Sequence, residues 1–180
     1  MVLTNLFQKP ERNSCMIIAI GGASTAGKTT LARALREFYH NRKVITLCQD
    51  DFVRPVESIP LVRDRIDWEH PDSIDHQAFL NAIVSESNEN EIVIAEGLMV
   101  FWHEEIGRLF DRSIFVKVDY DTFLRRKALD NRWGHEPEWY VQHIWTSFEV
   151  YGRPPQSGNL LILEGTKRID LQKVIQYIGI

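Results

Sequence analysis

The sequence predicts a three-layer α/β domain, in which a five-stranded parallel sheet is flanked by helices. Three observations lead to this fold class. Five short apolar runs recur along the 180 residues, and such continuous runs are typical of strands that are buried on both faces of a parallel sheet. Helix-like stretches alternate with these runs. A chain of this length can bury about 70% of its unfolded surface in one core without disulfides or metals.

The expected elements follow from these runs in chain order. Strands are expected at residues 15–21, 44–48, 92–95, 114–118 and 160–163, and helices at residues 29–41, 75–85, 104–109, 120–131, 138–151 and 170–177. Right-handed crossovers place the strand ends at one edge of the sheet, where ligands bind in such folds. The residues directly after each strand are therefore the candidate site residues. Two long polar connections, residues 52–71 and 132–137, are candidates for a substrate clamp or a lid.

A glycine-rich segment follows the first strand and opens the first helix. It holds the pattern Gly-x4-Gly-Lys-Thr, which runs from Gly22 to Gly27, Lys28 and Thr29 and predicts a phosphate-binding loop in this setting. The glycines let backbone N–H groups converge on a phosphate, and the helix N-terminus adds partial positive charge. Lys28 is expected to reach the β- and γ-phosphates, and the Thr29 hydroxyl to bind Mg²⁺. The expected triphosphate-binding run comprises Gly22, Ala23, Ser24, Thr25, Ala26, Gly27, Lys28, Thr29 and Thr30.

Acidic residues follow the second and third strands. Asp50 and Asp51 are adjacent, so in an extended segment only one of them faces the γ-phosphate. An aspartate there can orient an attacking hydroxyl and accept its proton. Glu96 follows the third strand and is a candidate Mg²⁺ ligand. The alternatives are that the two aspartates are solvated loop residues and that Glu96 has no metal role.

Charge and composition exclude several classes of partner. The chain has 21 Lys and Arg against 25 Asp and Glu, and the basic residues are scattered, which argues against a nucleic-acid partner and favours a small molecule. The first fifteen residues contain no apolar signal region, and no segment is long enough to span a bilayer, so we expect a cytoplasmic protein without a membrane partner. Cys15 and Cys48 are interpreted as reduced thiols without chemistry.

Several ordered motifs together resemble a known family. They are Gly-Gly-Ala-Ser-Thr-Ala-Gly-Lys-Thr-Thr-Leu (21–31), Gln-Asp-Asp-Phe (49–52) with Pro55, Asp-Trp-Glu-His-Pro-Asp-Ser-Ile-Asp (67–75), Glu-Gly-Leu-Met-Val-Phe (96–101), Arg125-Arg126 and Gly165-Thr166-Lys167. Over nearly the whole chain the sequence resembles the uridine kinase and nicotinamide riboside kinase group of P-loop kinases, and the nicotinamide riboside kinases more closely. The resemblance implies a P-loop NTPase fold in a single kinase domain (1–180), with ATP and Mg²⁺ as cofactors. GTP stays open as the donor.

The resemblance also implies roles for acceptor-site residues. Asp50 becomes the base for the ribose 5′-hydroxyl, and Asp51 a bystander. Trp68 stacks on the base, and Glu69 binds the ribose hydroxyls, although related enzymes usually carry Asp at that position. Phe52, at the start of a substrate clamp spanning about 52–71, joins the substrate-binding residues.

A lid at about residues 125–138 is implied as well. Arg125, Arg126 and Arg132 would offset the charge of the transferring phosphoryl group, whereas the alternative is a solvated cationic helix face. Trp133 would bring a second ring onto the base. Gly165 and Thr166 match the loop whose backbone lines the adenine.

The nucleoside is inferred from a missing insertion. Uridine kinases insert a pyrimidine-recognising hairpin before the third core strand, whereas residues 76–90 comprise only fifteen residues here. Two tryptophans suit the cationic ring of nicotinamide riboside, since a cation between indole faces gains about 0.5–2 kcal/mol.

We expect a monomer or homodimer that phosphorylates nicotinamide riboside. Uridine or cytidine and other small metabolites are the alternative acceptors. A regulatory nucleotide switch is the alternative class, but its Asp-x-x-Gly and Asn-Lys-x-Asp motifs do not occur.

Overall fold

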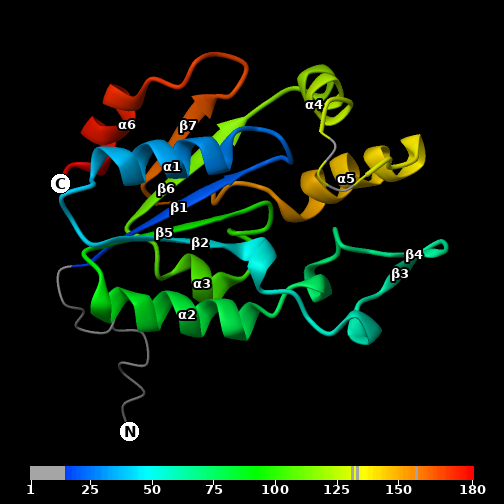
Figure 1. The fold of residues 1–180 in the computed structure, drawn as a ribbon, viewed down its shortest axis with the longest axis horizontal. Helices are drawn as coiled ribbons and strands as arrows, with labels where there is room; N and C mark the ends of the chain where they lie inside the picture. The colour runs from blue at the N-terminus through cyan, green and yellow to red at the C-terminus, as the bar shows by residue number, and fades with distance from the viewer. Residues whose placement is uncertain (1–14, 131, 133, 157) are drawn as a thin grey trace, which may run out of the picture.

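The computed structural model describes residues 15–130, 132, 134–156 and 158–180. Within them, five parallel strands form one sheet in the order β2-β5-β1-β6-β7 (Figure 1). The strands are β1 (Met16–Gly22), β2 (Val44–Cys48), β5 (Ile92–Gly97), β6 (Arg112–Lys117) and β7 (Leu160–Glu164). The predicted five-stranded parallel sheet is thereby confirmed, with each strand within a few residues of its expected position.

Helices cover both faces of the sheet. They are α1 (Lys28–Phe38), α2 (His76–Glu89), α3 (Glu104–Gly107), α4 (Tyr120–Lys127), α5 (Glu138–Tyr151) and α6 (Leu171–Ile178). Figure 1 shows α1 and α6 on one face and α2 and α3 on the other, with α4 and α5 beyond the carboxyl ends of the strands. Among the described residues, none of these helices combines the length and apolar character that crossing a bilayer requires.

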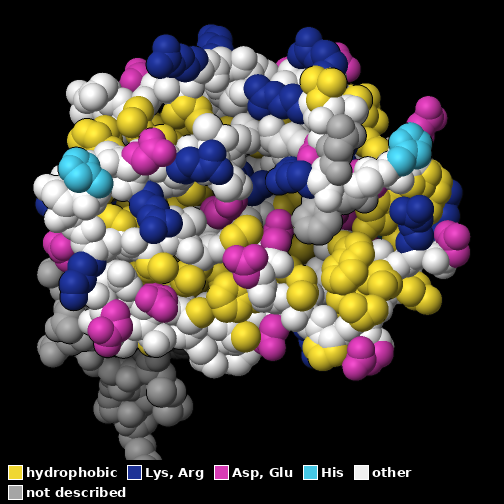
Figure 2. All heavy atoms as spheres, viewed as in Figure 1, with side chains coloured by type: hydrophobic (Ala, Val, Ile, Leu, Met, Phe, Trp, Pro, Cys, Tyr) yellow, Lys and Arg dark blue, Asp and Glu magenta, His cyan; other side chains and the backbone are white. Residues whose placement is uncertain are grey.

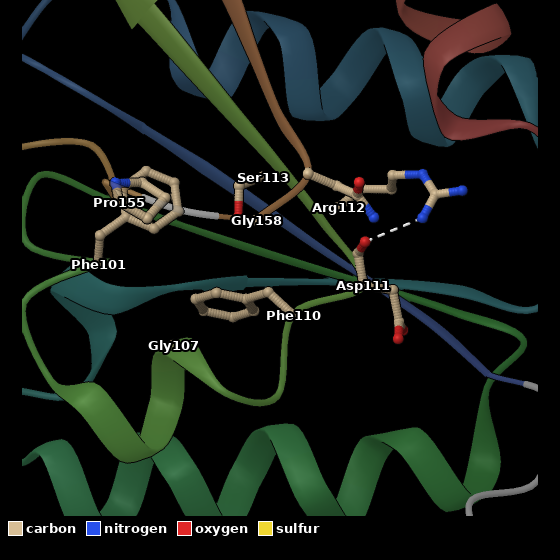
Figure 3. Close-up of a pocket in the computed structure, with 9 residues that line it drawn as sticks. Phe101, Gly107, Phe110, Asp111, Arg112, Ser113, Pro155 and Gly158 are labelled. Carbon is tan, nitrogen blue, oxygen red and sulfur yellow. Dashed lines mark hydrogen bonds between the residues drawn. The ribbon is translucent and has the colours of Figure 1, made fainter. Parts of the chain in front are cut away.

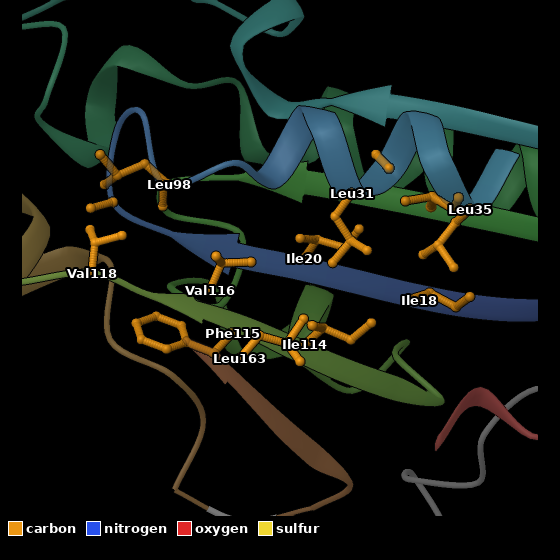
Figure 4. Packing of buried hydrophobic residues seen from close by; sticks show 14 of the residues in the cluster. Ile18, Ile20, Leu31, Leu35, Leu98, Ile114, Phe115, Val116, Val118 and Leu163 are labelled. Carbon is orange, nitrogen blue, oxygen red and sulfur yellow. The ribbon is translucent and has the colours of Figure 1, made fainter. Parts of the chain in front are cut away.

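The core has two halves, because successive strand side chains point to opposite faces. In β1, Ile18 and Ile20 pack with Leu31 and Leu35 of α1 (Figure 4). The intervening β1 residues pack on the other face with α2 and α3. A strand buried on both faces needs the continuous apolar run that the sequence shows.

Aspartates begin three of the helices. Asp75, Asp119 and Asp170 each accept a hydrogen bond from a backbone N–H in the first turn of α2, α4 and α6, at 2.8, 2.7 and 3.1 Å. Such N-caps satisfy donors that the helix leaves open. They explain why two expected helices, starting at residues 75 and 170, begin in the structure one residue later.

The main departures from the expected elements lie beyond the carboxyl edge. Helix α4 ends at Lys127 rather than 131, because the amides of Leu129 and Asp130 bond three residues back, to Arg126 and Lys127, which tightens and closes the last turn. In the 52–71 segment an antiparallel hairpin forms from β3 (Leu61–Val62) and β4 (Arg65–Ile66).

Candidate active site

The loop between β1 and α1 needs its two key glycines. Gly22 and Gly27 have φ angles of 146° and 106°, which L side chains rarely adopt. A Cβ on Gly22 would also lie 2.4 Å from the Val116 carbonyl oxygen. The Lys28 Nζ donates a hydrogen bond to the Ala23 carbonyl at 3.1 Å, so the lysine folds back over the loop. This is the backbone geometry of an anion-binding loop at a helix N-terminus.

Thr29 and Glu96 meet at the start of α1. The Thr29 Oγ1 donates to the Glu96 Oε1 at 2.6 Å, and Glu96 is buried at the end of β5. A hydroxyl beside one carboxylate fits Mg²⁺, which is commonly held by one or two protein oxygens together with substrate phosphates. Two residues that are 67 positions apart in the sequence thus form the oxygen pair that the sequence predicts.

A cavity of about 710 Å³ opens beside this loop. Ser24 and Lys28 line its phosphate end, Asp50 lies beside them, and Trp68 and Glu69 line the part formed by the clamp segment. Figure 2 shows acidic and basic side chains gathered around this hollowed part of the surface, with hydrophobic side chains over the neighbouring β3–β4 hairpin. The phosphate loop, Asp50 and the Trp68–Glu69 pair, which the sequence predicts separately, therefore line the same cavity.

Other predicted residues lie outside this cavity's lining. Asp51 is exposed, and Phe52 packs on Phe79 of the core with ring centroids 5.1 Å apart. Thr30 is exposed on α1. Thr166 is exposed as well. Trp133 falls outside the described residues.

The three arginines occupy different environments. The Arg126 guanidinium donates to the Gly165, Thr25 and Ala26 carbonyls at 2.6, 3.1 and 3.4 Å, so it ties the phosphate loop to the loop after β7. A Cβ on Gly165 would lie 2.9 Å from the Ala26 carbonyl oxygen, which shows how closely these two loops approach.

The other two arginines bond within their own segment. Arg125 is exposed and donates to the Thr122 hydroxyl at 2.9 Å. Arg132 forms a two-pronged contact with Asp130, with both distances 2.7 Å. This contact lowers the pKa of Asp130 to about 2 and raises the pKa of Arg132, which the charges of Asp50 and Glu96 raise further.

A buried ion pair in the cavity was missed by sequence reasoning. The Lys127 Nζ lies 2.7 Å from the Glu136 Oε2, and the two side chains are only 4% and 12% exposed. Both line the cavity, together with Tyr140. A lysine in the last turn of a helix looks like an ordinary partner for the helix dipole. Only its position directly after Arg125-Arg126 hinted at a role.

Glu69 has the most perturbed carboxyl group of the cavity. Burial raises its pKa to about 7, the negative charge of Asp50 adds to this, and the positive charge of Lys127 opposes it. Desolvation disfavours the charged form of an acid. Titratable groups perturbed in this way and facing a cavity are typical of functional sites.

A second cavity of about 340 Å³ lies at the amino-terminal ends of β6 and β7 (Figure 3). Phe101, Phe110, Arg112 and Ser113 are among the residues that line it. None of the predicted site residues that the structure describes lines it, and it lies at the edge of the sheet opposite to the phosphate loop. The predicted site residues that share a cavity therefore do so in the larger one.

Several known proteins are similar to this chain in sequence. No protein-family model matches the chain. It is 24% identical to uridine-cytidine kinase 2-B of Danio rerio over 204 residues (90% of this chain, 78% of that protein). It is 30% identical to uridine kinase of Chlamydia pneumoniae over 142 residues, which is 64% of each chain and so just under two thirds of that relative. It is 26% identical to nicotinamide riboside kinase 1 of Homo sapiens over 170 residues (84% of each).

Solved structures show the same fold. A sugar kinase from Janibacter sp. HTCC2649 superposes with a TM-score of 0.63 at 14% identity, covering 92% of this chain and 95% of that one. A possible uridine kinase from Bacillus stearothermophilus gives 0.54 at 14% identity, covering 82% and 89%. The fold is that of the P-loop kinases. Within that class the sequence relatives support a uridine kinase-like family, to which the nicotinamide riboside kinases are close.

Proposed function

We propose that this protein transfers the γ-phosphoryl group of ATP to the 5′-hydroxyl of a nucleoside, and that nicotinamide riboside is the acceptor, giving nicotinamide mononucleotide for NAD salvage. The observation that carries the proposal is the single cavity that joins the phosphate loop to Asp50 and to Trp68 and Glu69. A kinase must bring a donor phosphate and an acceptor hydroxyl into line within one water-poor site. This cavity provides both ends.

The proposed mechanism assigns each step to a residue of the chain. Backbone N–H groups of residues 22–29 and the Lys28 ammonium hold the β- and γ-phosphates. Asp50 orients the acceptor hydroxyl and takes its proton as the oxygen–phosphorus bond forms and the bond to the β-phosphate oxygen breaks, which releases ADP. Thr29 and Glu96 would hold Mg²⁺, which when bound neutralises charge on the β- and γ-phosphates.

The arginines divide between two roles in this mechanism. Arg126, tied to three backbone carbonyls, keeps the phosphate loop and the adenine-lining backbone at Gly165 and Thr166 together. Arg125 and Arg132 belong to the proposed lid, at about residues 125–138, and would meet the triphosphate when it closes. In the described conformation both bond to neighbouring side chains, so this role requires them to exchange partners.

Carboxyl groups near Trp68 favour a cationic acceptor. Asp50, Asp64, Glu69 and Glu136 line the cavity, as do Lys28, Arg65 and Lys127. Lys127 is paired with Glu136 and Lys28 belongs to the proposed phosphate end, which leaves Asp50, Asp64 and Glu69 against Arg65. The Trp68 side chain is 42% exposed and so offers ring surface to a ligand. A pyridinium over an indole, close to carboxylates, gains both cation–π and Coulomb energy. Uridine or cytidine is the second candidate, because the uridine kinases match this chain as well as the nicotinamide riboside kinases do.

We also propose that residues 1–180 form a single kinase domain with a clamp at about 52–71, acting in the cytoplasm as a monomer or homodimer.

A coupled ADP-release assay over a small acceptor panel tests the function. The panel contains nicotinamide riboside, uridine, cytidine, gluconate and pantothenate, with ATP or GTP as the donor. The expected result is the highest kcat/KM for nicotinamide riboside with ATP. A preference for uridine or cytidine would contradict nicotinamide riboside as the acceptor but would still support nucleoside kinase activity. The absence of acceptor-dependent ADP release would contradict the whole proposal.

A loop variant provides the control for this assay. Lys28→Ala should abolish transfer while the far-ultraviolet circular dichroism and the unfolding midpoint stay close to those of the wild type. The reason is that the Lys28 ammonium makes one hydrogen bond to the loop and is otherwise available to a phosphate. Unchanged turnover in a folded Lys28→Ala protein would show that the loop does not hold the donor.

A further inference from the structure

The segment that carries Trp68 and Glu69 has no regular secondary structure. It lies between β4 and a short 3₁₀ turn at Pro71–Ser73. Trp68 and Glu69, which both line the cavity, belong to no strand or helix whose hydrogen bonds would fix their backbone. Other contacts must therefore hold their orientation. The position of these two side chains decides where an acceptor sits, because misplacing reacting groups by about 1 Å can lower rates about 100-fold.

Two buried side chains contact this segment: the Ser73 hydroxyl donates to the Trp68 carbonyl at 2.9 Å, and Asp67, directly before Trp68, links the segment to α5. Its Oδ1 accepts one hydrogen bond from the Glu69 backbone N–H at 3.2 Å and another from the His143 Nε2 at 2.7 Å. Asp67 is only 8% exposed. Neither Asp67 nor His143 lines the cavity. The nearly buried Asp67 carboxylate therefore links the segment that carries Trp68 and Glu69, here called the acceptor segment, to α5 outside the cavity.

Further contacts link α5 to the same segment. The Arg63 guanidinium lies 4.3 Å from the centroid of the Trp139 ring, and the Tyr140 hydroxyl lies 3.5 Å from the Ile66 carbonyl oxygen. Trp139 and His143 are four residues apart and so lie on one side of α5. Of these contacts, the Asp67–His143 pair is the shortest, and Asp67 directly precedes Trp68, whose backbone also interacts with the Tyr140 hydroxyl.

We propose that Asp67 and His143 are positioning residues, which act together to hold Trp68 and Glu69 in the orientation that receives the acceptor. The proposal rests on the function proposed above. Removing Asp67 takes the acceptor away from both the Glu69 amide and the His143 imidazole, and removing His143 leaves Asp67 bonded to the Glu69 amide but no longer to α5. Either change costs a nearly buried carboxylate contact, so the segment is free to shift. Since α5 follows directly on the proposed lid, the pair also fixes the acceptor segment relative to the base of that lid.

Steady-state kinetics of four variants test this role. Asp67→Ala and His143→Ala should each raise the acceptor KM about tenfold, with the KM for ATP unchanged, and the double variant should be no worse than either single one, as expected for residues acting as one unit. Asp67→Asn should stay close to wild type, because its side-chain oxygen can still accept both hydrogen bonds. The assay uses the panel nucleoside that the wild type phosphorylates best.

A stability-matched control separates positioning from general loosening. Tyr177→Phe removes a hydroxyl that donates to the Ser113 carbonyl at 3.1 Å, at the amino-terminal end of β6, far from the acceptor segment in the fold. It should lower the unfolding midpoint without changing the acceptor KM. Additive effects in the double variant, or an equal rise of KM in Tyr177→Phe, would overturn the proposal.

Hydrogen exchange provides a readout that does not depend on activity. The Glu69 amide, which bonds to the Asp67 carboxylate, should exchange faster in Asp67→Ala and in His143→Ala than in the wild type and Tyr177→Phe. Unchanged exchange would also overturn the proposal. A wild-type enzyme that phosphorylates no panel nucleoside would contradict the proposed function only, because exchange at Glu69 would still decide whether the pair holds this segment.

Discussion

Glu69→Gln should make the protein more stable at high pH and less active where the wild-type carboxyl is ionised. In the wild type the Glu69 carboxyl has a pKa of about 7 against an ordinary value of 4.5, so the folded state keeps its proton over a range in which the unfolded chain has lost it. The contribution of Glu69 to stability therefore falls as the pH rises from about 4.5 to about 7, and stays level above that range. At 1.36 kcal/mol per pH unit the full difference is about 3 kcal/mol.

The variant should avoid this loss because an amide cannot ionise. Glu69 is partly exposed, so solvent screening reduces the effect, and about 1–3 kcal/mol is the expected gain at pH 8.5. For a chain of this size, each 1 kcal/mol shifts the unfolding midpoint by about 2–4 °C. At pH 4, where both states of the wild type are protonated, the two proteins should unfold at the same temperature.

Urea and thermal unfolding between pH 4 and pH 8.5 measure this difference. Glu89→Gln, which removes an exposed carboxylate on α2, is the matched control and should show no such pH dependence. The reasoning is refuted if the stability difference between Glu69→Gln and wild type is the same at pH 5 and at pH 8.5. Kinetics complete the test, since Glu69→Gln should raise the acceptor KM and lower kcat because loss of ribose anchoring misplaces the 5′-hydroxyl.

Three further tests, which use five variants, address the proposed base, the stacking ring and the contacts of Arg126. Asp50→Asn should lower kcat by roughly 10²- to 10⁴-fold, whereas Asp51→Asn should lower it less because Asp51 does not line the cavity. Steady-state kinetics of both variants test this ranking, and a reversed ranking would assign the base to Asp51. Trp68→Leu should mainly raise the KM for nicotinamide riboside, since stacking acts before and during transfer, so a pure kcat effect in the same assay would contradict stacking. Arg126→Met should raise the KM for ATP and lower the free energy of unfolding by about 1–3 kcal/mol, because it loses the hydrogen bonds to three carbonyls. In denaturant unfolding, Arg125→Met should be much less affected. Equal losses of stability in the two variants would argue that Arg126 does not hold the two loops together.

The sheet was predictable because each core strand carries its signal locally. Residues 16–20 are apolar without interruption, and both faces of β1 are buried. The β3–β4 hairpin was not predictable, since its strands have two residues each and show no alternating pattern. Its turn holds Arg63 at a φ of 55° in place of the asparagine or glycine that marks such turns.

The arrangement of the proposed donor half of the site was also predictable from local pattern and topology. A glycine-rich loop places Lys28 and Thr29, and parallel pairing brings the end of β5 beside the end of β1, so that Glu96 reaches Thr29. Nothing in the local sequence places Lys127 against Glu136, or His143 against Asp67. Those contacts depend on how α4, α5 and the clamp segment fold over the sheet edge, and 76 residues separate His143 from Asp67.

The proposed donor and acceptor ends of the cavity are held in place by different kinds of contact. The proposed donor end rests on β1, α1 and β5, whose backbone is held by the sheet ladder and by Gly22 and Gly97, which have no room for a side chain. The proposed acceptor end rests on side-chain contacts between the clamp segment and α5, of which Asp67–His143 is the shortest. Side-chain contacts can be exchanged without disturbing a sheet, whereas the loop at Gly22 cannot accept even a methyl group. Substitutions in residues 60–69 and 127–143 should therefore alter the acceptor preference at constant KM for ATP, which is the pattern expected when one fold serves several substrates.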